Sequence, residues 1–582
     1  MKRIEKRTIL NLNISCLLIV LCLFSVVSAQ AQAPKWAEKA RKAVVKITTY
    51  NAQKQKLGEG TAFFMDESGV ALSAFSLFKG VDSAVATDYE GNEMPVDLIM
   101  GVNDLYDVVK IHITPAKKKV NALELAQQKP QVGENIVMVP YSTEKKAEAI
   151  IGSVEEATPM EGDFYYTLAL ITVPEQNSSP IFNSEGEVFA LLQPPAEEND
   201  TKSYALPVSY ALSLSIGALS FNDPLLNAIG IPKDLPPTRD EAVAMLYLTQ
   251  ANPADRERIA DLLNRFVARY PEDAEGYKMR SNFYSSLYDD NESLSQVEAD
   301  LEKVMALSED KAEAYYHNSQ CILNYAARKD SAALPFKDWG YERSLAEVQK
   351  AIELDPKPLY IQQEANIYSL MKEYAKAYEA FQKVNATNLA SYSTFYASSR
   401  LLRAMGDTTS LALSLMDSCI ARLATPYGPA AAPYLFERAE MRIAAGADSA
   451  ALADYDAYER CVQGQRLNAL FYYKREQVAM RLKKYDRAME DIQTALKQLP
   501  NDPALLEERG SVLVSTARYE EALNSLNASL AQSPNRPYAL RLKGFALLQL
   551  DRREEAQAAL KEAHNLGDEV STQLLTRFFG GI

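Results

Sequence analysis

Hydrophobic and polar positions follow two different patterns along this 582-residue chain. From about residue 42 to residue 217, short runs of β-branched and aromatic residues are separated by Gly, Asp, Asn and Pro. Such runs with turn residues between them predict β-strands, and many of them in succession predict an antiparallel barrel or sandwich. The runs that carry this prediction span residues 43–48, 61–65, 71–75, 107–113, 135–140, 165–173 and 188–192.

After residue 240 the pattern changes to longer segments rich in Ala, Leu, Tyr and Glu, with the period of helices. These segments repeat every 34 residues. The spacing recurs at Tyr485 and Tyr519, at Ala488, Ala522 and Ala556, at Ile492, Leu526 and Leu560, at Gly510 and Gly544, and at Pro500 and Pro534. A regular internal repeat of this length predicts an array in which each unit packs on its neighbours.

This repeat resembles the tetratricopeptide repeat, in which small residues let two helices cross closely and a proline ends the second helix. The resemblance implies an all-α superhelix of about seven or eight units. It would span residues 241–582, be most regular at 468–569, and bind extended peptides or proteins in its groove. The Lys and Asn clamp of chaperone adaptors is not expected, because the corresponding groove positions hold Leu470, Tyr473, Gln477, Met480, Ala504, Glu507 and Ser511.

Residues 218–240 join the two patterns. Four prolines fall between residues 223 and 237, and no long hydrophobic run interrupts them. Such a composition predicts either a linker or a packed connector.

The N-terminus has the layout of a secretory signal peptide over residues 1–29. Four basic residues precede an apolar run from Ile14 to Val27, and small residues follow it, with cleavage expected after Ala29 or Ala31. A retained membrane anchor is the weaker alternative, since the run is shorter than the roughly 20 residues that a span needs. We therefore expect an exported protein, periplasmic or associated with the cell envelope, with no transmembrane segment after cleavage.

Charge and composition narrow the possible partners. The formal net charge of −15 argues against nucleic acid, which needs a clustered basic face. His112, His317 and His564 are the only histidines, and no CxxC motif is present, so neither a metal site nor a cofactor is expected. If the signal is removed, three cysteines remain, and an odd number scattered among helices favours buried thiols over a disulfide framework. They are Cys321, Cys419 and Cys461.

Seven short motifs follow one another through the β-rich half. They are Ala43–Ile47, Gly58–Phe64, Gly69–Ser76, Asp107–Ile111, Val132–Glu134, Phe182–Val188 and Tyr204–Pro207. In this order they resemble the trypsin-like serine proteases of the high-temperature-requirement type, a secreted double-barrel family. The resemblance implies a chymotrypsin-like, all-β double barrel over residues 38–217, so the whole chain is expected to be multidomain.

The same resemblance places Ser76 at the histidine of the catalytic triad, Asp107 at the aspartate and Asn177 at the nucleophilic serine. A serine becomes a nucleophile only when a neighbouring base takes its proton, and the aspartate orients that base. A hydroxyl at position 76 is not a base near neutral pH, and an amide at position 177 is not a useful acyl acceptor. The domain is therefore predicted to be a protease fold with no catalytic residues.

Residues 175–180 read Glu-Gln-Asn-Ser-Ser-Pro where the family has Gly-Asp/Asn-Ser-Gly-Gly-Pro. Glu175 replaces a glycine whose N–H would help to bind the oxyanion, and Ser178 and Ser179 replace the two glycines after the nucleophile. His112 follows Asp107 on the same predicted strand, where we expect an ordinary strand histidine.

Three functions remain open from the sequence. The leading hypothesis is an exported adaptor or scaffold whose inactive cleft and repeat groove bind proteins or extended peptides. The second is an active secreted serine endopeptidase, in which a slip of one residue would make Ser178 the nucleophile. The third is a barrel that caps the array and binds nothing.

Overall fold

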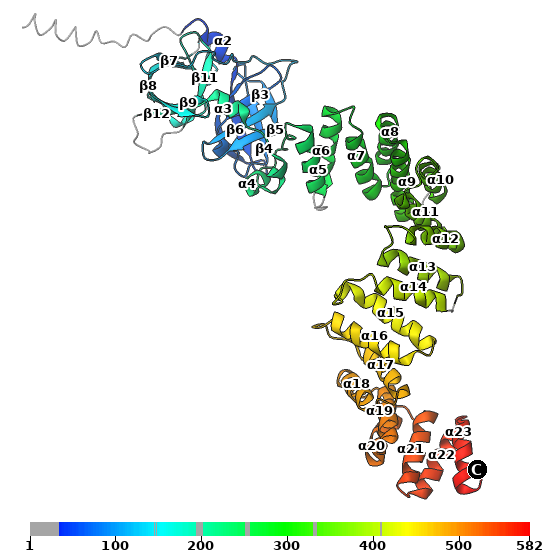
Figure 1. The fold of residues 1–582 in the computed structure, drawn as a ribbon. Helices are drawn as coiled ribbons and strands as arrows, with labels where there is room; N and C mark the ends of the chain where they lie inside the picture. The colour runs from blue at the N-terminus through cyan, green and yellow to red at the C-terminus, as the bar shows by residue number, and fades with distance from the viewer. Residues whose placement is uncertain are drawn as a thin grey trace, which may run out of the picture. The chain divides into compact units, whose positions relative to one another are not determined.

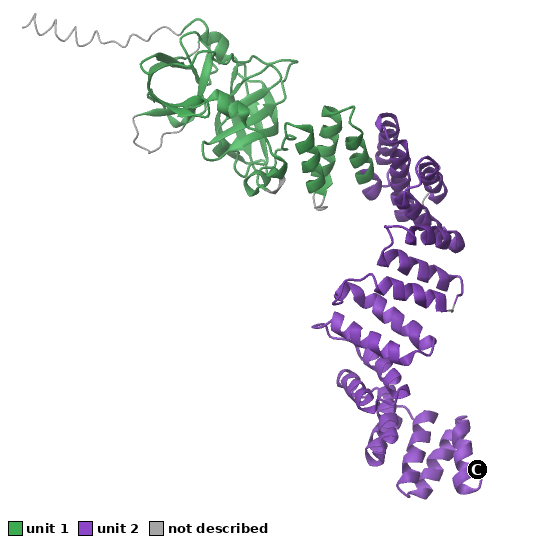
Figure 2. Cartoon of the chain, viewed as in Figure 1, with its two compact units in different colours: residues 1–283 green, residues 284–582 purple. Residues whose placement is uncertain are grey.

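A computed structural model describes residues 34–581, except 145, 147, 194–201, 251–255, 330–334 and 408–409. The chain divides into two compact units, Met1–Phe283 and Tyr284–Ile582 (Figure 2). The first unit holds the β-strands and the first helices, and the second holds helices (Figure 1). The expected signal peptide lies outside the described residues.

The first six strands close into one antiparallel barrel in the order β1-β2-β3-β6-β5-β4. They are β1 (Val44–Tyr50), β2 (Lys56–Phe64), β3 (Val70–Ser73), β4 (Ser83–Thr87), β5 (Glu93–Asn103) and β6 (Val108–Ile113). The next six close into a second barrel in the order β10-β11-β12-β9-β8-β7. They are β7 (Asn135–Met138), β8 (Ile150–Met160), β9 (Asp163–Ala169), β10 (Pro180–Phe182), β11 (Val188–Gln193) and β12 (Ser203–Pro207).

The two barrels confirm the predicted all-β double-barrel fold class. Strands β4, β5, β8, β10 and β12 were missing from the hydrophobic runs, and β8 shows one reason. Only Val154 of its residues is buried, so β8 lacks the alternation that marks a half-buried strand. Its pairing with β7 and β9 makes it a strand.

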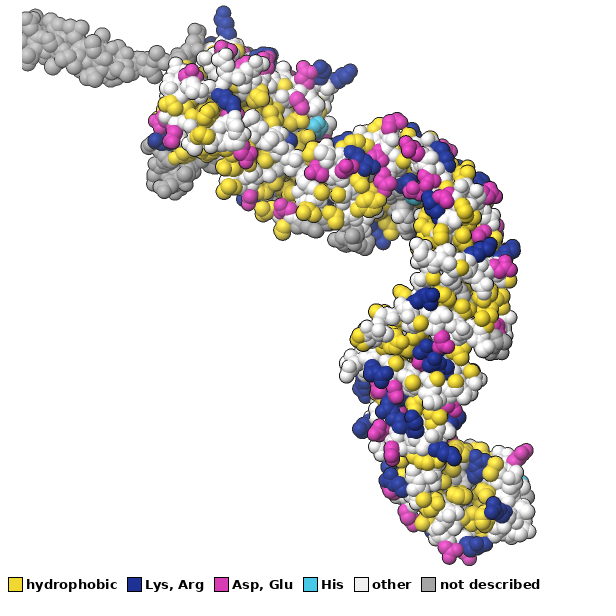
Figure 3. All heavy atoms as spheres, viewed as in Figure 1, with side chains coloured by type: hydrophobic (Ala, Val, Ile, Leu, Met, Phe, Trp, Pro, Cys, Tyr) yellow, Lys and Arg dark blue, Asp and Glu magenta, His cyan; other side chains and the backbone are white. Residues whose placement is uncertain are grey.

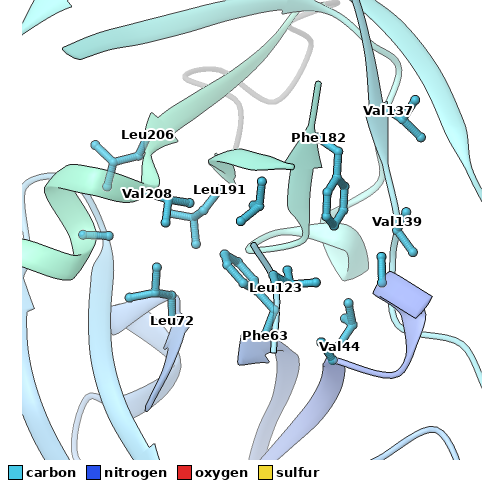
Figure 4. Packing of buried hydrophobic residues seen from close by; sticks show 14 of the residues in the cluster. Val44, Phe63, Leu72, Leu123, Val137, Val139, Phe182, Leu191, Leu206 and Val208 are labelled. Atoms are coloured by element: carbon cyan, nitrogen blue, oxygen red, sulfur yellow. The ribbon is translucent and has the colours of Figure 1, made fainter. Parts of the chain in front are cut away.

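An apolar core joins the two barrels (Figure 4). Phe63 and Leu72 of the first barrel and Phe182 and Leu191 of the second are fully buried in this single cluster. Trp36, just before α2 (Ala37–Arg41), packs on Phe182 with ring centroids 5.2 Å apart. Because the core is shared, the loops at the strand ends are held in fixed positions.

The proline-rich connector contains η3 (Ala218–Asn222) and α4 (Pro224–Asn227) and packs on the first barrel. The N–H of Ile99 in β5 donates to the carbonyl of Pro232 at 2.8 Å, and the N–H of Asp234 donates to the carbonyl of Ile99 at 2.8 Å. Helices α5 (Arg239–Gln250) and α6 (Arg256–Arg269) follow, and α7 (Ala274–Leu287) spans the division between the units. A short helix, α3 (Val208–Ser213), precedes the connector.

Helices of the second unit pack in consecutive pairs, beginning with α9 on α10 and ending with α21 on α22, against which α23 lies. This arrangement confirms the predicted all-α array. The helices are α8 (Asn291–Leu307), α9 (Lys311–Arg328), α10 (Tyr341–Leu354), α11 (Pro358–Leu370), α12 (Tyr374–Asn385), α13 (Tyr392–Ala404), α14 (Ser410–Ile420), α15 (Ala432–Ala444), α16 (Asp448–Cys461), α17 (Ala469–Arg481), α18 (Tyr485–Gln498), α19 (Pro503–Ser515), α20 (Tyr519–Gln532), α21 (Pro537–Gln549), α22 (Arg553–Asn565) and α23 (Glu569–Phe579).

The 34-residue spacing has a direct packing cause. A Cβ built on Gly510 in α19 would lie 2.5 Å from a Leu526 methyl carbon in α20, and one on Gly544 would lie 2.6 Å from Cγ of Leu560. Each glycine therefore lets the two helices of its pair approach closely.

Candidate functional site

The structure brings two of the three triad positions together. Ser76 lies in η1 (Phe75–Phe78), just after β3, and Asp107 lies just before β6. Because β3 and β6 are antiparallel neighbours, the end of one strand lies beside the start of the other. The N–H of Ser76 donates to Oδ1 of Asp107 at 2.5 Å, and its hydroxyl donates to Oδ2 at 2.8 Å.

This pair has a consequence for catalysis. Both carboxylate oxygens of Asp107 accept hydrogen bonds from Ser76, the residue predicted to stand at the position of the base. In a triad the aspartate holds an imidazole that takes the nucleophile's proton. Here it holds a hydroxyl, which does not take up a proton near neutral pH. Asp107 itself has a φ of +44°, a left-handed conformation that aspartate adopts more readily than most residues.

Asn177 follows η2 (Pro174–Gln176) in the turn that leads into β10. Its N–H donates back to the carbonyl of Pro174 at 3.1 Å, and its side-chain Oδ1 is buried without a hydrogen-bond partner in the described part of the chain. The oxyanion hole of a serine protease uses the N–H at this position. That donor is occupied within the 3₁₀ turn, and Glu175 lies inside the same turn.

Ser178 has the backbone of a glycine position but a buried side chain. Its φ is +65°, in the left-handed region, and only 2% of the residue is exposed. Its N–H donates to the carbonyl of Leu192 at 2.9 Å, which ties the turn to β11. A nucleophile must reach the substrate, so this burial weighs against the slipped-register alternative. Ser179 is also fully buried, and its hydroxyl lacks a partner among the described residues.

His112 lies near the far end of β6 from Asp107 and is engaged elsewhere. Its Nδ1 lies 2.6 Å from Oδ1 of Asp97, and its Nε2 lies 3.0 Å from the carbonyl oxygen of Ser68. Both partners are acceptors, so the ring donates from both nitrogens when protonated. The hydrogen bond to the Asp97 carboxylate raises the pKa of His112 above its usual 6.5. These contacts match the expected strand histidine.

Strand β2 is the element at which the two halves of the site converge. Both η1 and η2 contact it. On the η1 side, a Cβ at Gly60 would lie 2.8 Å from a Leu77 methyl carbon, so the absence of a side chain lets η1 lie close to the strand. In the described residues, no hydrogen bond links Asn177 to Ser76 or Asp107.

Sequence reasoning missed an exposed apolar edge beside this site. Ile171 is 88% exposed and Val173 is 49% exposed, immediately before η2. Both fell within a run predicted as strand, residues 165–173, but β9 ends at Ala169. The alternation of Ile, Thr and Val was a signal for an extended segment, yet only the structure shows that both apolar side chains face solvent.

Some of the groove positions considered for a clamp form hydrogen bonds with other residues of the array. Glu507 accepts two hydrogen bonds from Arg536, at 2.9 and 2.8 Å, and Ser511 hydrogen-bonds the hydroxyl of Tyr538 at 2.9 Å. Leu470, by contrast, is 57% exposed. On the visible face of the protein, acidic and basic side chains are interspersed (Figure 3).

Other candidate chemistry is sparse in the described residues. All three of their cysteines are buried and none forms a disulfide, and burial raises the pKa of Cys419 to about 11. Within the same residues, no group of three or more His, Cys, Asp or Glu side chains could hold a metal ion. Nor does any described helix combine the length and apolarity needed to cross a membrane.

Comparison with known proteins gives no family for this chain. No family model matches it, and no curated protein matches it significantly in sequence.

Proposed function

We propose that this chain is an exported, non-catalytic adaptor or scaffold for proteins. It would combine an inactive trypsin-like domain of the high-temperature-requirement type with a tetratricopeptide-repeat array. The observation that carries the proposal is the Ser76–Asp107 pair. An aspartate at the predicted triad position that is bonded to a hydroxyl supplies no base for a nucleophile.

Three further contacts support a cleft that does not cut. The N–H of Asn177 is bonded inside its own turn, Ser178 is buried, and His112 is bonded to Asp97 and Ser68. Together they remove the oxyanion donor, the substitute nucleophile and the substitute base. Peptide binding needs none of these, because it rests on extended backbone and apolar contacts.

The exposed apolar edge formed by Ile171 and Val173 offers a place for such contacts beside the site. The array offers a second surface, since repeat arrays expose long grooves to their partners. With the signal peptide indicated by the sequence, the place of action would be the periplasm or the cell envelope. Partners would be proteins or extended peptides.

The catalytic part of the proposal is tested with a fluorophosphonate probe on the purified mature protein. We expect no labelling of the wild type, of Asn177→Ser, or of the Ser178→Ala control, while trypsin in the same buffer is labelled. Restoring a serine at 177 alone should fail because the base and the oxyanion donor are still missing. Stoichiometric labelling that is lost in Ser178→Ala would establish the endopeptidase alternative instead, and peptide cleavage by Asn177→Ser would refute the inactive-site interpretation.

The binding part is tested by crosslinking and co-purification from the native cell envelope. The full chain should retain a defined set of proteins. Retention of some of them should be lost in Ile171→Asp/Val173→Asp, a pair of exposed changes that leaves the barrel core intact. If the wild type retains nothing beyond an empty-vector control, the adaptor proposal fails.

A further inference from the structure

The array contains an apolar groove that the proposed function does not assign. It lies between α15 and α17 and the segment that joins α16 to α17, and its volume is about 730 Å³. Three aromatic residues line it, and the ring of Tyr458 contacts the other two. Tyr458 has its ring centroid 5.4 Å from that of Phe436 and 5.2 Å from that of Phe471.

Apolar side chains continue to the rim of this groove. Leu470, in the first turn of α17, lines it and is 57% exposed. Pro433, in the first turn of α15, is exposed on the opposite wall. A concave, largely apolar surface with a few polar groups at its edge is typical of binding sites.

The charges around the groove are not balanced. Glu437, the acidic residue of the lining, accepts hydrogen bonds from the hydroxyl of Tyr396 at 2.7 Å and from Arg403. Lys474, over the Phe436 ring, is paired with Glu440 at 2.6 Å. Arg466 lines the groove and is exposed, and no residue in the described ranges forms a hydrogen bond or an ion pair with it.

We propose that this groove docks an extended segment of a partner protein that carries a bulky apolar side chain next to an Asp or Glu. The apolar side chain would enter over the rings of Phe436, Tyr458 and Phe471, and its carboxylate neighbour would meet Arg466. This inference rests on the proposed adaptor function and specifies the ligand of its repeat array. Apolar anchors supply most of the affinity of such contacts, and a charge at the rim mainly selects the partner.

Charge complementarity distinguishes this occupant from a basic segment. The Glu437 carboxylate is already satisfied by Arg403 and Tyr396, so it offers little to a cationic partner. The guanidinium of Arg466 is a planar donor suited to a carboxylate. A segment with Lys or Arg at the same place would face an unpaired positive charge.

The test uses a phage library of random nonapeptides panned on the purified full chain. Selected peptides should combine an aromatic or aliphatic residue with a nearby Asp or Glu. Their Kd, measured by fluorescence polarisation, should rise at least about tenfold in Leu470→Asp, which places a charge at the groove rim. In Arg466→Glu the Kd of acidic peptides should rise more than that of their Asn or Gln versions.

Leu359→Asp is the matched control. Leu359 occupies the second position of α11 as Leu470 does in α17, and it is 45% exposed outside this groove. The Kd of the selected peptides for Leu359→Asp should equal their Kd for the wild type, and circular dichroism should show that all variants are folded. Peptides that bind Leu470→Asp as tightly as the wild type, or that are enriched in Lys and Arg, would overturn the groove proposal while leaving the adaptor function standing. Failure to select any peptide would also overturn it, whereas fluorophosphonate labelling would overturn the adaptor function itself.

Discussion

The double barrel and the helical array place their polar side chains in opposite ways. At the candidate site, Ser76 in η1 is exposed and Asp107, just before β6, is half-buried, and both lie at strand ends outside the apolar core. In the array, Arg475 and Asp491 pair inside the packing of α17 and α18, with side chains 2% and 3% exposed. Polar groups at the strand ends can therefore be replaced without loss of the barrel, whereas the buried ion pair is part of what holds two helices together.

The details of the Arg475 cluster explain this dependence. Its guanidinium donates to both oxygens of Asp491, at 2.9 and 2.7 Å, and to Glu459 at 2.7 Å. It also lies over the ring of Phe471, 4.9 Å from the centroid. One buried cation on α17 thus satisfies carboxylates on both neighbouring helices, α16 and α18.

The two regions can be followed separately in the intact chain. Its two tryptophans fall one in each region, Trp36 beside the barrel core and Trp339 in the array. In a Trp339→Phe variant, fluorescence reports on the barrel, while circular dichroism at 222 nm reports mainly on the helices. The two signals therefore measure the unfolding of each region separately, and we expect four effects.

The largest effect is expected from Arg475→Met. It removes the bidentate partner of the buried Asp491 carboxylate and leaves only Arg487, 3.8 Å away. The free energy of unfolding of the array should therefore fall by about 3–5 kcal/mol. Urea denaturation followed at 222 nm measures the change. The barrel transition, followed by Trp36 fluorescence, should stay where it is.

Arg552→Met is the matched control for this change, because Arg552, the residue before α22, forms an exposed pair with Glu555 in the first turn of that helix. It should change the array transition much less than Arg475→Met does, since solvent screens exposed pairs. Equal shifts in the two variants would mean that the buried pair has no special part in the array.

A second, pH-dependent effect is expected from Glu476→Gln. Glu476 is fully buried, and both its carboxylate oxygens lack partners in the described residues. Burial, with smaller contributions from Glu508 and Asp491, raises its pKa from 4.5 to about 8. A folded pKa above the unfolded value means that the stabilising contribution is complete below about pH 4.5 and is lost as the pH rises through about 8.

The wild-type array should therefore lose stability relative to Glu476→Gln between pH 5 and pH 9, by on the order of 2–3 kcal/mol. Urea midpoints at 222 nm over this range measure the difference. Glu555→Gln, which removes an exposed carboxylate, should have urea midpoints that change with pH as those of the wild type do. If the midpoints of Glu476→Gln also follow those of the wild type, the carboxyl group of Glu476 is not held in its neutral form.

A smaller effect is expected from Gly510→Ala. The added Cβ would lie 2.5 Å from the side chain of Leu526, so either this side chain or the two helices must shift. The cost of this overpacking, less the gain in helix propensity, should lower the free energy of unfolding of the array by about 1–2 kcal/mol.

Gly428→Ala tests whether the effect comes from packing. Nothing lies within 4 Å of a Cβ at Gly428, and its φ of −91° suits alanine. Its transition should match that of the wild type. A stabilised Gly510→Ala would show that close helix approach does not depend on this glycine.

The smallest effect is expected in the barrel, from His112→Gln. The Asp97 carboxylate raises the pKa of His112, so its stabilising contribution is complete below about pH 6.5 and is lost as the pH rises through the folded value. Wild type should exceed His112→Gln in stability by at most about 1 kcal/mol at pH 6, because water screens this partly exposed pair. Urea denaturation followed by Trp36 fluorescence at pH 6 and pH 9 measures this stability difference. A difference that is larger at pH 9 than at pH 6 would contradict the pairing of His112 with Asp97.

Much of the fold could be predicted from particular residues. The glycine at 510 and the leucine at 526 recur 34 residues on, and the structure shows them in contact. The strand around Val188–Leu192 was equally clear, since every residue of β11 is buried. Strand β8 was not predictable, because its polar pattern becomes a strand only through pairing with β7 and β9.

For the candidate site, the sequence suggested residues but not their geometry. Its resemblance to trypsin-like proteases assigned Ser76, Asp107 and Asn177 to the three triad positions, and this assignment stays a prediction. The sequence did not show that Asp107 accepts hydrogen bonds from both the N–H and the hydroxyl of Ser76. Nor did it show that the N–H of Asn177 donates to the carbonyl of Pro174. Backbone N–H directions depend on turn conformation, which single residue identities specify weakly.

The sequence by itself determined two things about this protein. It determined the repeat array, because each unit contacts mainly its neighbours and so records its packing within about 34 residues. It also determined the lack of a histidine base at position 76. Tertiary structure alone decided the exposure of Leu470, the burial of Glu476 and the burial of Ser178. Exposure and burial depend on contacts between segments that are far apart in the sequence. One such contact is the hydrogen bond from the N–H of Ser178 to the carbonyl of Leu192, which holds the turn against β11.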